Sequence, residues 1–308
     1  MLAAIDAGSN TFRLLIGRVA DGKVIPELYL RRICRLAGEL SSEGGLSPAA
    51  RKRALFAFME LAEACRQSDV QKVRVVGTAA FRQAINGEAF VAEIREATRL
   101  PLEIISGDEE AEYMATGVLS ALDPMPPQAL IVDIGGGSTE FVLCLHQKVV
   151  WSRSLSLGVV RLTEEFTSSS RRQKIIDRTL AELTSELVKT CHALGIDFSG
   201  LTLIGTAGTV TTLAALDMQM AEYDWQRVNN YYLPFSRIQH WQSMLISLNT
   251  EEREALPGIE SGRGDLILSG LEIMLCLMQQ INTDSLTVSD FGILEGLLIS
   301  LHNEVSHS

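Results

Sequence analysis

The chain has 308 residues, of which 46% are hydrophobic and 21% charged, and its formal net charge is −11 at pH 7. This length and composition predict a globular protein with two domains of ordinary size. The acidic charge argues against a general nucleic-acid-binding protein, and the lack of any run of 18 apolar residues argues against a membrane-spanning one.

The cysteines and the amino-terminal residues indicate a cellular compartment. The five cysteines are odd in number, scattered and mostly placed in apolar segments, which is typical of buried free thiols in a reducing environment. The amino terminus enters an apolar strand at once, without the basic stretch and apolar core of a signal sequence. We therefore expect a cytoplasmic protein.

The first half of the chain predicts three consecutive strands followed by alternating helices and strands. Serine is a favoured helix cap and proline a favoured first helical residue, so Ser47 and Pro48 predict the start of the first helix. Apolar alternation and helical spacing predict the other elements. We expect strands at residues 2–5, 11–19, 23–32, 73–76 and 102–105, and helices from 48 onward, at 88–99 and from about 108 to 122.

The second half repeats this order. Three prolines between residues 124 and 127 interrupt the chain and place a domain boundary near residue 122. Leucines and isoleucines at helical spacing between residues 176 and 187 predict a long amphipathic helix. We expect strands at residues 129–132, 140–145, 149–155, 201–204 and 286–289, and later helices at 235–256, 263–281 and 292–301.

The order of the predicted elements indicates the fold class. Strands that alternate with helices are typical of α/β proteins, and the order β-β-β-α-β-α seen twice is that of an actin-like architecture. We expect an α/β fold with two actin-like, ribonuclease H-like domains, each a mixed five-stranded sheet with flanking helices. The domains would span 1–122 and 123–291, and a helix at about 292–308 would pack back on the first.

Two glycine-rich loops, Asp6–Thr11 and Asp133–Glu140, each join one apolar run to the next. Glycine lets backbone amides approach an anion closely, and successive amides in such turns form an anion-binding concavity. A carboxylate beside the concavity would repel phosphate, so Asp133 and Glu140 indicate a hard divalent metal ion between them and the anion. Neither loop fits the Walker or Rossmann pattern. Two such loops predict a duplicated domain that binds a polyanion in the cleft between its halves.

An acidic stretch follows Ser106 and Gly107 at the predicted start of a helix. Glu109 and Glu110 at this position are compatible with two roles. The carboxylates compensate the helix dipole and cap the first turn, or one of them takes a proton from the water that attacks a phosphoanhydride. The residues by themselves leave both roles open.

Together with the segments Ile105–Ala111 and Gly205–Thr209, the two loops resemble the exopolyphosphatase and guanosine pentaphosphate phosphatase family. This family is a branch of the actin, hexokinase and chaperone-ATPase superfamily. The resemblance runs from residue 2 to about residue 300, and the chain is similar to the short, two-domain members. It implies that Glu110 is the catalytic base and Glu109 a neighbouring candidate.

The resemblance also implies a set of ligands for phosphate and metal. Asp133 and Glu140 would hold Mg²⁺ or Mn²⁺, with Asp6 as a weaker ligand through water. Gly208 and Thr209 lie at a helix start, where amides favour anions. The expected phosphate ligands in the loops are Ser9, Asn10, Thr11, Gly135, Gly136, Gly137, Ser138 and Thr139.

Three arginines match motifs of the family, and arginine can bridge phosphate oxygens with two parallel hydrogen bonds. Arg82 resembles a family arginine that reaches the substrate. Arg161 has two possible roles, binding substrate or pairing with a glutamate of its own helix. Arg263 matches an Arg-Ala-Asp stretch of the family in which glycine here replaces alanine, and Leu294 stands where many members have arginine.

The predicted activity is metal-dependent hydrolysis that releases terminal orthophosphate from inorganic polyphosphate. Hydrolysis of guanosine pentaphosphate (pppGpp) is the alternative within the same chemistry, and the residues do not separate the two. An actin-like ATPase would instead need an adenosine pocket near Gly205–Thr209, and a kinase would need an acceptor site. The family resemblance is compatible with a homodimer.

Overall fold

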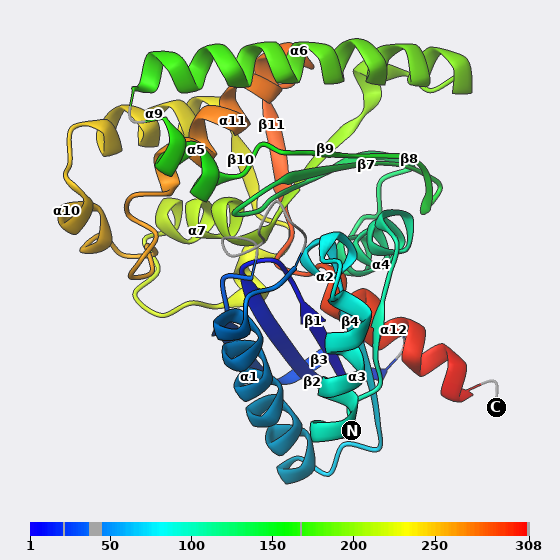
Figure 1. The fold of residues 1–308 in the computed structure, drawn as a ribbon. Coiled ribbons are helices and arrows are strands. Elements are labelled where there is room, and N and C mark those ends of the chain that lie inside the picture. Colours follow the sequence, from blue (N-terminus) through cyan, green and yellow to red (C-terminus); the bar gives the residue numbers. More distant parts are fainter. Residues whose placement is uncertain (21, 37–44, 167, 307–308) are drawn as a thin grey trace. The chain divides into compact units, whose positions relative to one another are not determined.

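The computed structural model describes residues 1–20, 22–36, 45–166 and 168–306. The chain forms two compact units, one that combines Met1–Ser120 with Gly292–Ser308 and one that spans Ala121–Phe291. Each unit has one mixed sheet with flanking helices (Figure 1), which confirms the predicted α/β class. Within the described residues, no helix is long and apolar enough to cross a membrane.

The sheet of the first unit has five strands among the described residues, in the order β3-β2-β1-β4-β5. β1 runs antiparallel to β2 and parallel to β4, so the chain crosses over the sheet between β3 and β4. The strands are β1 (Leu2–Ala7), β2 (Thr11–Ala20), β3 (Lys23–Ile33), β4 (Lys72–Gly77) and β5 (Leu102–Ile104), and the helices are α1 (Pro48–Gln67), α2 (Ala79–Gln83), α3 (Gly87–Thr98), α4 (Gly107–Ser120) and α12 (Ile293–Ser306).

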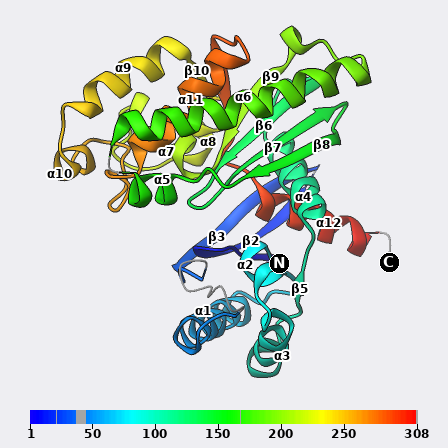
Figure 2. The ribbon, with the colours of Figure 1, turned by 45° about the horizontal axis from the view of Figure 1, so that its top comes forward.

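Helices α1 and α3 cover one face of this sheet and α12 covers the other (Figure 2). Ser47 caps α1 as expected, since its hydroxyl accepts a hydrogen bond from the amide of Ala50. Phe58 of α1 packs on Phe12 of β2 with ring centroids 4.7 Å apart. Because side chains alternate along a strand, Leu15 points to the opposite face, where α12 leaves it 1% exposed.

Helices α4 and α12 cross with their backbones in contact. A Cβ atom added to Gly117 would lie 1.8 Å from the carbonyl oxygen of Gly292, and one added to Gly296 would lie 1.8 Å from the carbonyl oxygen of Tyr113. Only glycine fits at such a crossing. The crossing fixes α4, whose first turn carries Glu109 and Glu110, on the frame of the first unit.

The second unit repeats the hairpin and crossover, and its sheet has a sixth strand beyond the five expected. The order among the described residues is β10-β11-β9-β6-β7-β8. The strands are β6 (Gln128–Ile134), β7 (Thr139–Leu145), β8 (Lys148–Leu155), β9 (Thr202–Thr206), β10 (Tyr232–Pro234) and β11 (Ser285–Val288), and the helices are α5 (Val159–Glu165), α6 (Ser169–Leu194), η2 (Phe198–Gly200), α7 (Ala207–Asp217), α8 (Trp225–Val228), α9 (Phe235–Ile246), α10 (Thr250–Glu254) and α11 (Ile267–Gln280).

The prediction of one continuous helix at residues 235–256 is wrong, because the chain forms two separate helices there, α9 and α10. Asn249 starts a new helix by forming a capping box with Glu252, in which each side chain accepts a hydrogen bond from the other residue's amide. A capping box satisfies amide groups that a helix start leaves without partners. The hydrogen bonds of the capping box therefore take the place of those in one turn of a continuous helix.

All five cysteines of the chain are buried and free. Burial raises the pKa of the Cys144 thiol to about 12, so it stays protonated at neutral pH. The structure therefore agrees with the expectation of structural thiols that pack in the core.

Asp217, at the end of α7, is a buried carboxylate that ties three later side chains together. The donors are Tyr231 Oη, Arg237 Nε and Trp241 Nε1, at 2.6, 2.8 and 2.6 Å from its oxygens. Burial acts to raise the pKa of this carboxyl, but the three donors outweigh burial and the pKa is lowered.

We expect Asp217→Asn to lower the stability at neutral pH by about 2 kcal/mol, since hydrogen bonds to a charged acceptor are stronger than neutral ones. The folded pKa lies below the unfolded one, so the carboxylate stabilises the fold above about pH 4 and loses this effect as the pH falls through the folded pKa. Thermal unfolding of both proteins across pH 3–8 checks this. A difference in unfolding midpoint that stays constant in acid would contradict it.

Candidate functional sites

The two glycine-rich loops are hairpin turns of the same construction. The amide of Gly8 donates to the carbonyl of Thr11 at 3.1 Å, and the amide of Gly135 donates to the carbonyl of Ser138 at 3.0 Å. Each glycine lies two residues after an aspartate at the end of a strand. The amides of Gly8 and Gly135 are therefore used to close the turns. In each loop the phosphate-binding donors would be the amides that follow.

The amides of the second loop are oriented by α5. The carbonyl of Gly135 accepts a hydrogen bond from the amide of Val159 at 3.0 Å, and the carbonyl of Gly136 accepts one from Val160 at 2.9 Å. In a trans peptide the carbonyl and the following amide point in opposite directions. The amides of Gly136 and Gly137 therefore point away from α5, together and outward, as an anion-binding concavity requires.

Asp133 and Glu140 lie directly opposite each other on β6 and β7. Cross-strand partners project from the same face with Cβ atoms about 5 Å apart. Glu140 Oε1 accepts hydrogen bonds from the hydroxyls of Ser138 at 2.6 Å and Ser154 at 2.8 Å, which orient the carboxylate. Two oxygen ligands beside a phosphate site suit Mg²⁺, which typically takes one or two carboxylates and keeps several waters.

No group of three or more histidine, cysteine, aspartate or glutamate side chains that could hold a metal ion occurs in the part of the chain that the structure describes. Asp133 and Glu140 alone therefore provide too few ligands to coordinate a metal ion fully. Such a pair would need water and substrate oxygens to complete the coordination of a metal ion.

The first loop differs from the second in its charge. Arg13 lies opposite Asp6 on β2, and its Nε and Nη2 lie 3.0 and 2.6 Å from Asp6 Oδ2. The Asp6 side chain is 4% exposed. The Arg13 guanidinium thus lies where a metal ion would bind Asp6 directly, and the weaker, water-mediated role expected for Asp6 stays a prediction.

At the start of α4, Glu109 and Glu110 have different partners. Glu109 forms a capping box with Ser106, in which its Oε2 accepts from the Ser106 amide at 2.8 Å and its own amide donates to Ser106 Oγ at 3.1 Å. Hydrogen bonding of the carboxylate to the Ser106 amide, and then to the Ser106 hydroxyl, lowers the pKa of Glu109. Glu110 instead accepts from Arg82 Nη1 at 2.8 Å, and Arg82 also donates to the carbonyl of Ile105 at 2.8 Å. The structure thus gives Glu109 a capping role and brings Glu110 and Arg82 together.

The turn from β9 into α7 brings together two further residues expected to bind phosphate. A Cβ atom on Gly208 would lie 1.8 Å from Arg263 Nη1, so the guanidinium lies directly against the Gly208 backbone. Arg263 also donates to Glu260 at 2.9 Å. Ala207 at this turn has φ 63°, a conformation that residues other than glycine rarely adopt. Such strain is a feature of functional turns.

Three expected ligands point elsewhere. The Thr139 side chain is fully buried and its hydroxyl donates to the carbonyl of Leu157. The Thr209 side chain packs on Gly270 of α11, where an added Cβ would lie 2.2 Å from Thr209 Cγ2. Arg161 pairs with Glu165 of its own helix at 3.0 Å. The hydroxyls of both threonines therefore do not face the loops. Arg161 forms the ion pair with a glutamate of its own helix that was one of its two expected roles.

Sequence reasoning missed Arg13 and Ser154. Both lie beside an expected residue on the neighbouring strand, since Arg13 pairs with Asp6 and Ser154 with Glu140. A signal was available, because a tight hairpin fixes which residues face each other across it. In the first hairpin, Asp6 and Arg13 lie the same number of residues from the centre of the turn, so they face each other.

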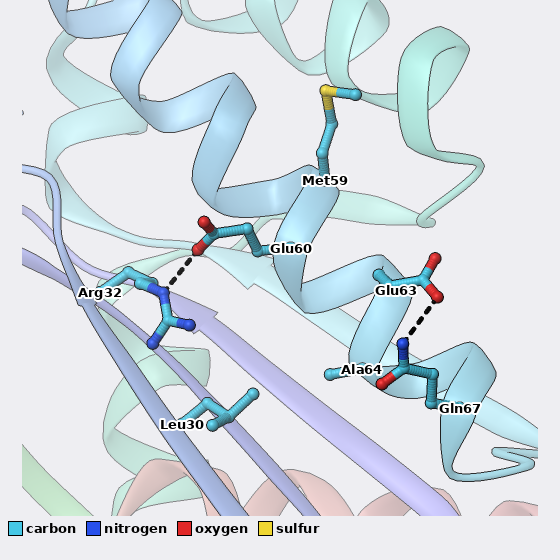
Figure 3. Close-up of a pocket in the computed structure, with 7 residues that line it drawn as sticks. All are labelled: Leu30, Arg32, Met59, Glu60, Glu63, Ala64 and Gln67. Carbon is cyan, nitrogen blue, oxygen red and sulfur yellow. Dashed lines mark hydrogen bonds and ion pairs between the residues drawn. The ribbon is translucent and has the colours of Figure 1, made fainter.

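A cavity of about 500 Å³ lies on the first unit between α1 and β3 (Figure 3). It is open, and its lining includes an ion pair between Arg32 Nε and Glu60 Oε2 at 2.5 Å. None of the residues expected to bind phosphate or metal lines it.

Comparison with known proteins gives relatives across the whole chain. Residues 15–305 match the model of the Ppx/GppA phosphatase family. Exopolyphosphatase 2 of Mycobacterium tuberculosis is 34% identical over 97% of this chain and 98% of its own length. The guanosine-5'-triphosphate,3'-diphosphate pyrophosphatase of Aeromonas salmonicida is 30% identical over 98% of this chain and 59% of its own length.

Solved structures agree with these relatives. The Ppx/GppA family member of Aquifex aeolicus superposes with a TM-score of 0.84 and 30% identity over 100% of this chain and 99% of its own. An exopolyphosphatase from Cytophaga hutchinsonii has the same fold, with a TM-score of 0.84 and 24% identity over 98% of both chains. The actin-like fold expected from the sequence is confirmed. The chain belongs to the Ppx/GppA phosphatase family.

Proposed function

We propose that this protein releases terminal orthophosphate from inorganic polyphosphate by metal-dependent hydrolysis. The observation that carries the proposal is the second hairpin loop, where the outward amides of Gly136 and Gly137 lie beside the paired carboxylates of Asp133 and Glu140. Amides attract an anion whereas carboxylates repel it, so this combination serves an anion that arrives with a divalent cation. A phosphate chain with Mg²⁺ or Mn²⁺ meets this requirement.

Each group at the sites has a proposed role. Asp133 and Glu140 hold the metal ion, which supplies neutralisation of phosphate charge when it is bound. Ser138 and Ser154 orient Glu140 through their hydroxyls. The amides of Gly136 and Gly137 bind phosphate oxygens, and the amides near Ser9, Asn10 and Thr11 do the same in the first unit.

Glu110 is proposed as the base that takes a proton from the attacking water. Its carboxylate is held by Arg82, which the carbonyl of Ile105 holds in turn. This chain of contacts fixes the position of the carboxylate, as general-base catalysis requires. Arg82 can also donate to a phosphate oxygen, since a guanidinium has five N–H donors.

Hydrolysis of pppGpp is the second candidate, because the relative of Aeromonas salmonicida is named for that nucleotide. We favour polyphosphate over pppGpp because this chain matches a larger share of the relative named as an exopolyphosphatase. This chain covers 98% of Exopolyphosphatase 2 but 59% of the nucleotide pyrophosphatase. The homodimer and the cytoplasmic location stay predictions.

Orthophosphate release from long-chain polyphosphate, pppGpp and ATP, measured side by side with Mg²⁺ and with EDTA, tests the proposal. We expect release from polyphosphate that requires Mg²⁺ and exceeds release from ATP. Faster release from pppGpp would favour the second candidate. Activity on ATP alone would indicate an actin-like ATPase, and no release from any substrate would refute the proposal.

Gly208→Ala is expected to raise the KM for polyphosphate about tenfold through Arg263, a loss typical of one charge-assisted hydrogen bond. The added methyl group overlaps the end of a flexible side chain, so Arg263 moves away and the fold stays intact. Arg263→Gln should give a similar increase in KM, and the double variant should be no worse than either single variant. Additive effects of the two substitutions would show that Gly208 acts independently of Arg263.

A further inference from the structure

Strand β3 forms one edge of the first sheet and carries large apolar side chains that are exposed. Within the described residues, no strand pairs with β3 on the side away from β2. Ile25, Tyr29 and Ile33 are 40%, 53% and 61% exposed, and burial alternates along the strand, so all three lie on one face. An edge strand with exposed apolar side chains is a template for pairing with another strand.

Two opposite charges lie between these apolar side chains on the same face. Glu27 precedes Tyr29 by two residues, and Arg31 follows it by two. Outward from Tyr29, this face therefore reads acid and then isoleucine in one direction, and base and then isoleucine in the other. Such a surface complements itself when a second copy runs antiparallel to it about a two-fold axis through Tyr29.

The charges distinguish this register from its alternatives. With the axis through Tyr29, Glu27 lies opposite Arg31 of the second copy. Ile25 then lies opposite Ile33, and the two tyrosines face each other. An axis through Glu27 or Arg31 would place like charges opposite each other, and an axis one residue to either side of Tyr29 would place the arginine opposite an isoleucine or the tyrosine. Opposite charges and aromatic pairs across strands stabilise a sheet, whereas like charges destabilise it.

The other face of β3 has room for the side chains of an added strand. Leu30 and Arg32 form one side of the open cavity of about 500 Å³, and α1 forms the other (Figure 3). With the axis through Tyr29, Leu28 of the second copy lies opposite Leu30, and Pro26 of the second copy lies opposite Arg32. Both are partly exposed in the single chain. Two apolar side chains would thus lie along the open side of this groove.

We propose that the edge of β3 is an interaction surface for a second copy of this chain, which pairs with it antiparallel about a two-fold axis through Tyr29. Proline has no amide hydrogen to donate, so Pro26 limits the main-chain hydrogen bonds to residues 27–31. Side chains extend the contact on both sides of this ladder. The pairing joins the sheets of the two first units into one continuous sheet and covers the exposed edge.

Sedimentation velocity over a range of micromolar protein concentrations tests the proposal. Wild-type protein is expected to form a dimer of its 33.7 kDa chain. Tyr29→Lys places two ammonium groups opposite each other on the axis and removes an aromatic pair, so it should raise the dissociation constant about tenfold or more. Tyr232→Lys is the matched control, since it makes the same change at a 58% exposed tyrosine on β10, the edge strand of the second unit. It should dimerise as wild type does.

Charge reversal tests the register. Glu27→Arg places two arginines opposite each other, and Arg31→Glu places two glutamates opposite each other, so each variant should dimerise more weakly. The double variant restores opposite charges and should recover the dimer. Within one chain the two positions are about 13 Å apart along the strand and do not touch. Glu27→Arg and the double variant both lose the ion pair with Arg18, so recovery must come from the second copy.

Disulfide cross-linking locates the axis. Residues directly opposite in an antiparallel pair have Cα atoms about 4.5–5.5 Å apart, within the range that a disulfide spans. Mild oxidation should therefore link two copies of Tyr29→Cys. Glu27→Cys alone should stay unlinked, whereas Glu27→Cys combined with Arg31→Cys should form the link. The native cysteines are buried, so wild type should stay unlinked.

The outcomes decide between this surface and any other. Wild-type protein that is monomeric at every concentration would overturn the inference. A dimer that withstands Tyr29→Lys and gives no cross-link through Tyr29→Cys would overturn it as well, since the second copy would then bind elsewhere. A monomeric Tyr29→Lys with the thermal unfolding midpoint of wild type, together with the Tyr29→Cys cross-link, would support it.

Discussion

Glu110→Gln is expected to reduce kcat for polyphosphate about 1,000-fold, within the range contributed by a general base. Glutamine has the same shape and keeps an oxygen that can accept from Arg82, but it cannot take a proton from water. The fold should not change, because Glu110 is partly exposed and its partner Arg82 keeps its bond to the Ile105 carbonyl. Steady-state orthophosphate release and thermal unfolding measure the two effects.

Glu109→Gln is the matched control for this variant. Glu109 is the adjacent carboxylate and forms the capping box with Ser106, so its replacement should weaken the start of α4 slightly and leave turnover near that of wild type. If Glu110→Gln retains near-normal turnover while Glu109→Gln does not, the base is Glu109, and the capping box would have to open during the reaction.

Asp133→Asn is expected to raise the Mg²⁺ concentration for half-maximal activity by at least tenfold, the loss typical even of residues that only support metal ligands. The amide side chain is a weaker ligand and carries no charge to balance a divalent ion. Titration of orthophosphate release with Mg²⁺ at saturating polyphosphate measures the shift. Turnover at saturating Mg²⁺ should recover at least in part, which separates a metal ligand from a base.

Asp197→Asn makes the same chemical change in the same unit at a residue with another role. Asp197 caps the short helix η2, where its Oδ1 accepts from the Ser199 amide at 3.0 Å. The Mg²⁺ dependence of orthophosphate release by Asp197→Asn should match that of wild type. An unchanged Mg²⁺ dependence in Asp133→Asn as well would remove Asp133 from the metal site.

The positions of the loops could be predicted because their signals are local. A strand that ends in Asp-x-Gly, followed by small residues and another apolar run, specifies a tight hairpin without knowledge of the rest of the chain. The repetition of this unit, followed by alternating helices and strands, then predicted the two α/β units. The long helix α6 was equally predictable from its apolar spacing.

The side-chain directions in the loops were harder to predict. Thr139 and Glu140 are neighbours in the sequence, and alternation along β7 puts one in the core and the other at the site. Thr209 packs on Gly270 of α11, a contact across 61 residues that no local pattern encodes. The ion pair of Asp6 with Arg13 depends on the cross-strand register, which the order of residues around Asp6 alone does not display. Spacing identifies which residues lie near a site, but register and packing decide which of them face it.

The crossing of α4 and α12 also constrains the order in which the chain can fold. The first unit needs α12, which follows the whole of residues 121–291 in the sequence. The whole of the second unit is synthesised before α12, so until then the sheet of the first unit lacks the helix that covers Leu15. Domains generally fold as units in the order of their synthesis. In this protein the unit that is synthesised first is completed last, so one apolar sheet face stays uncovered until the final helix arrives.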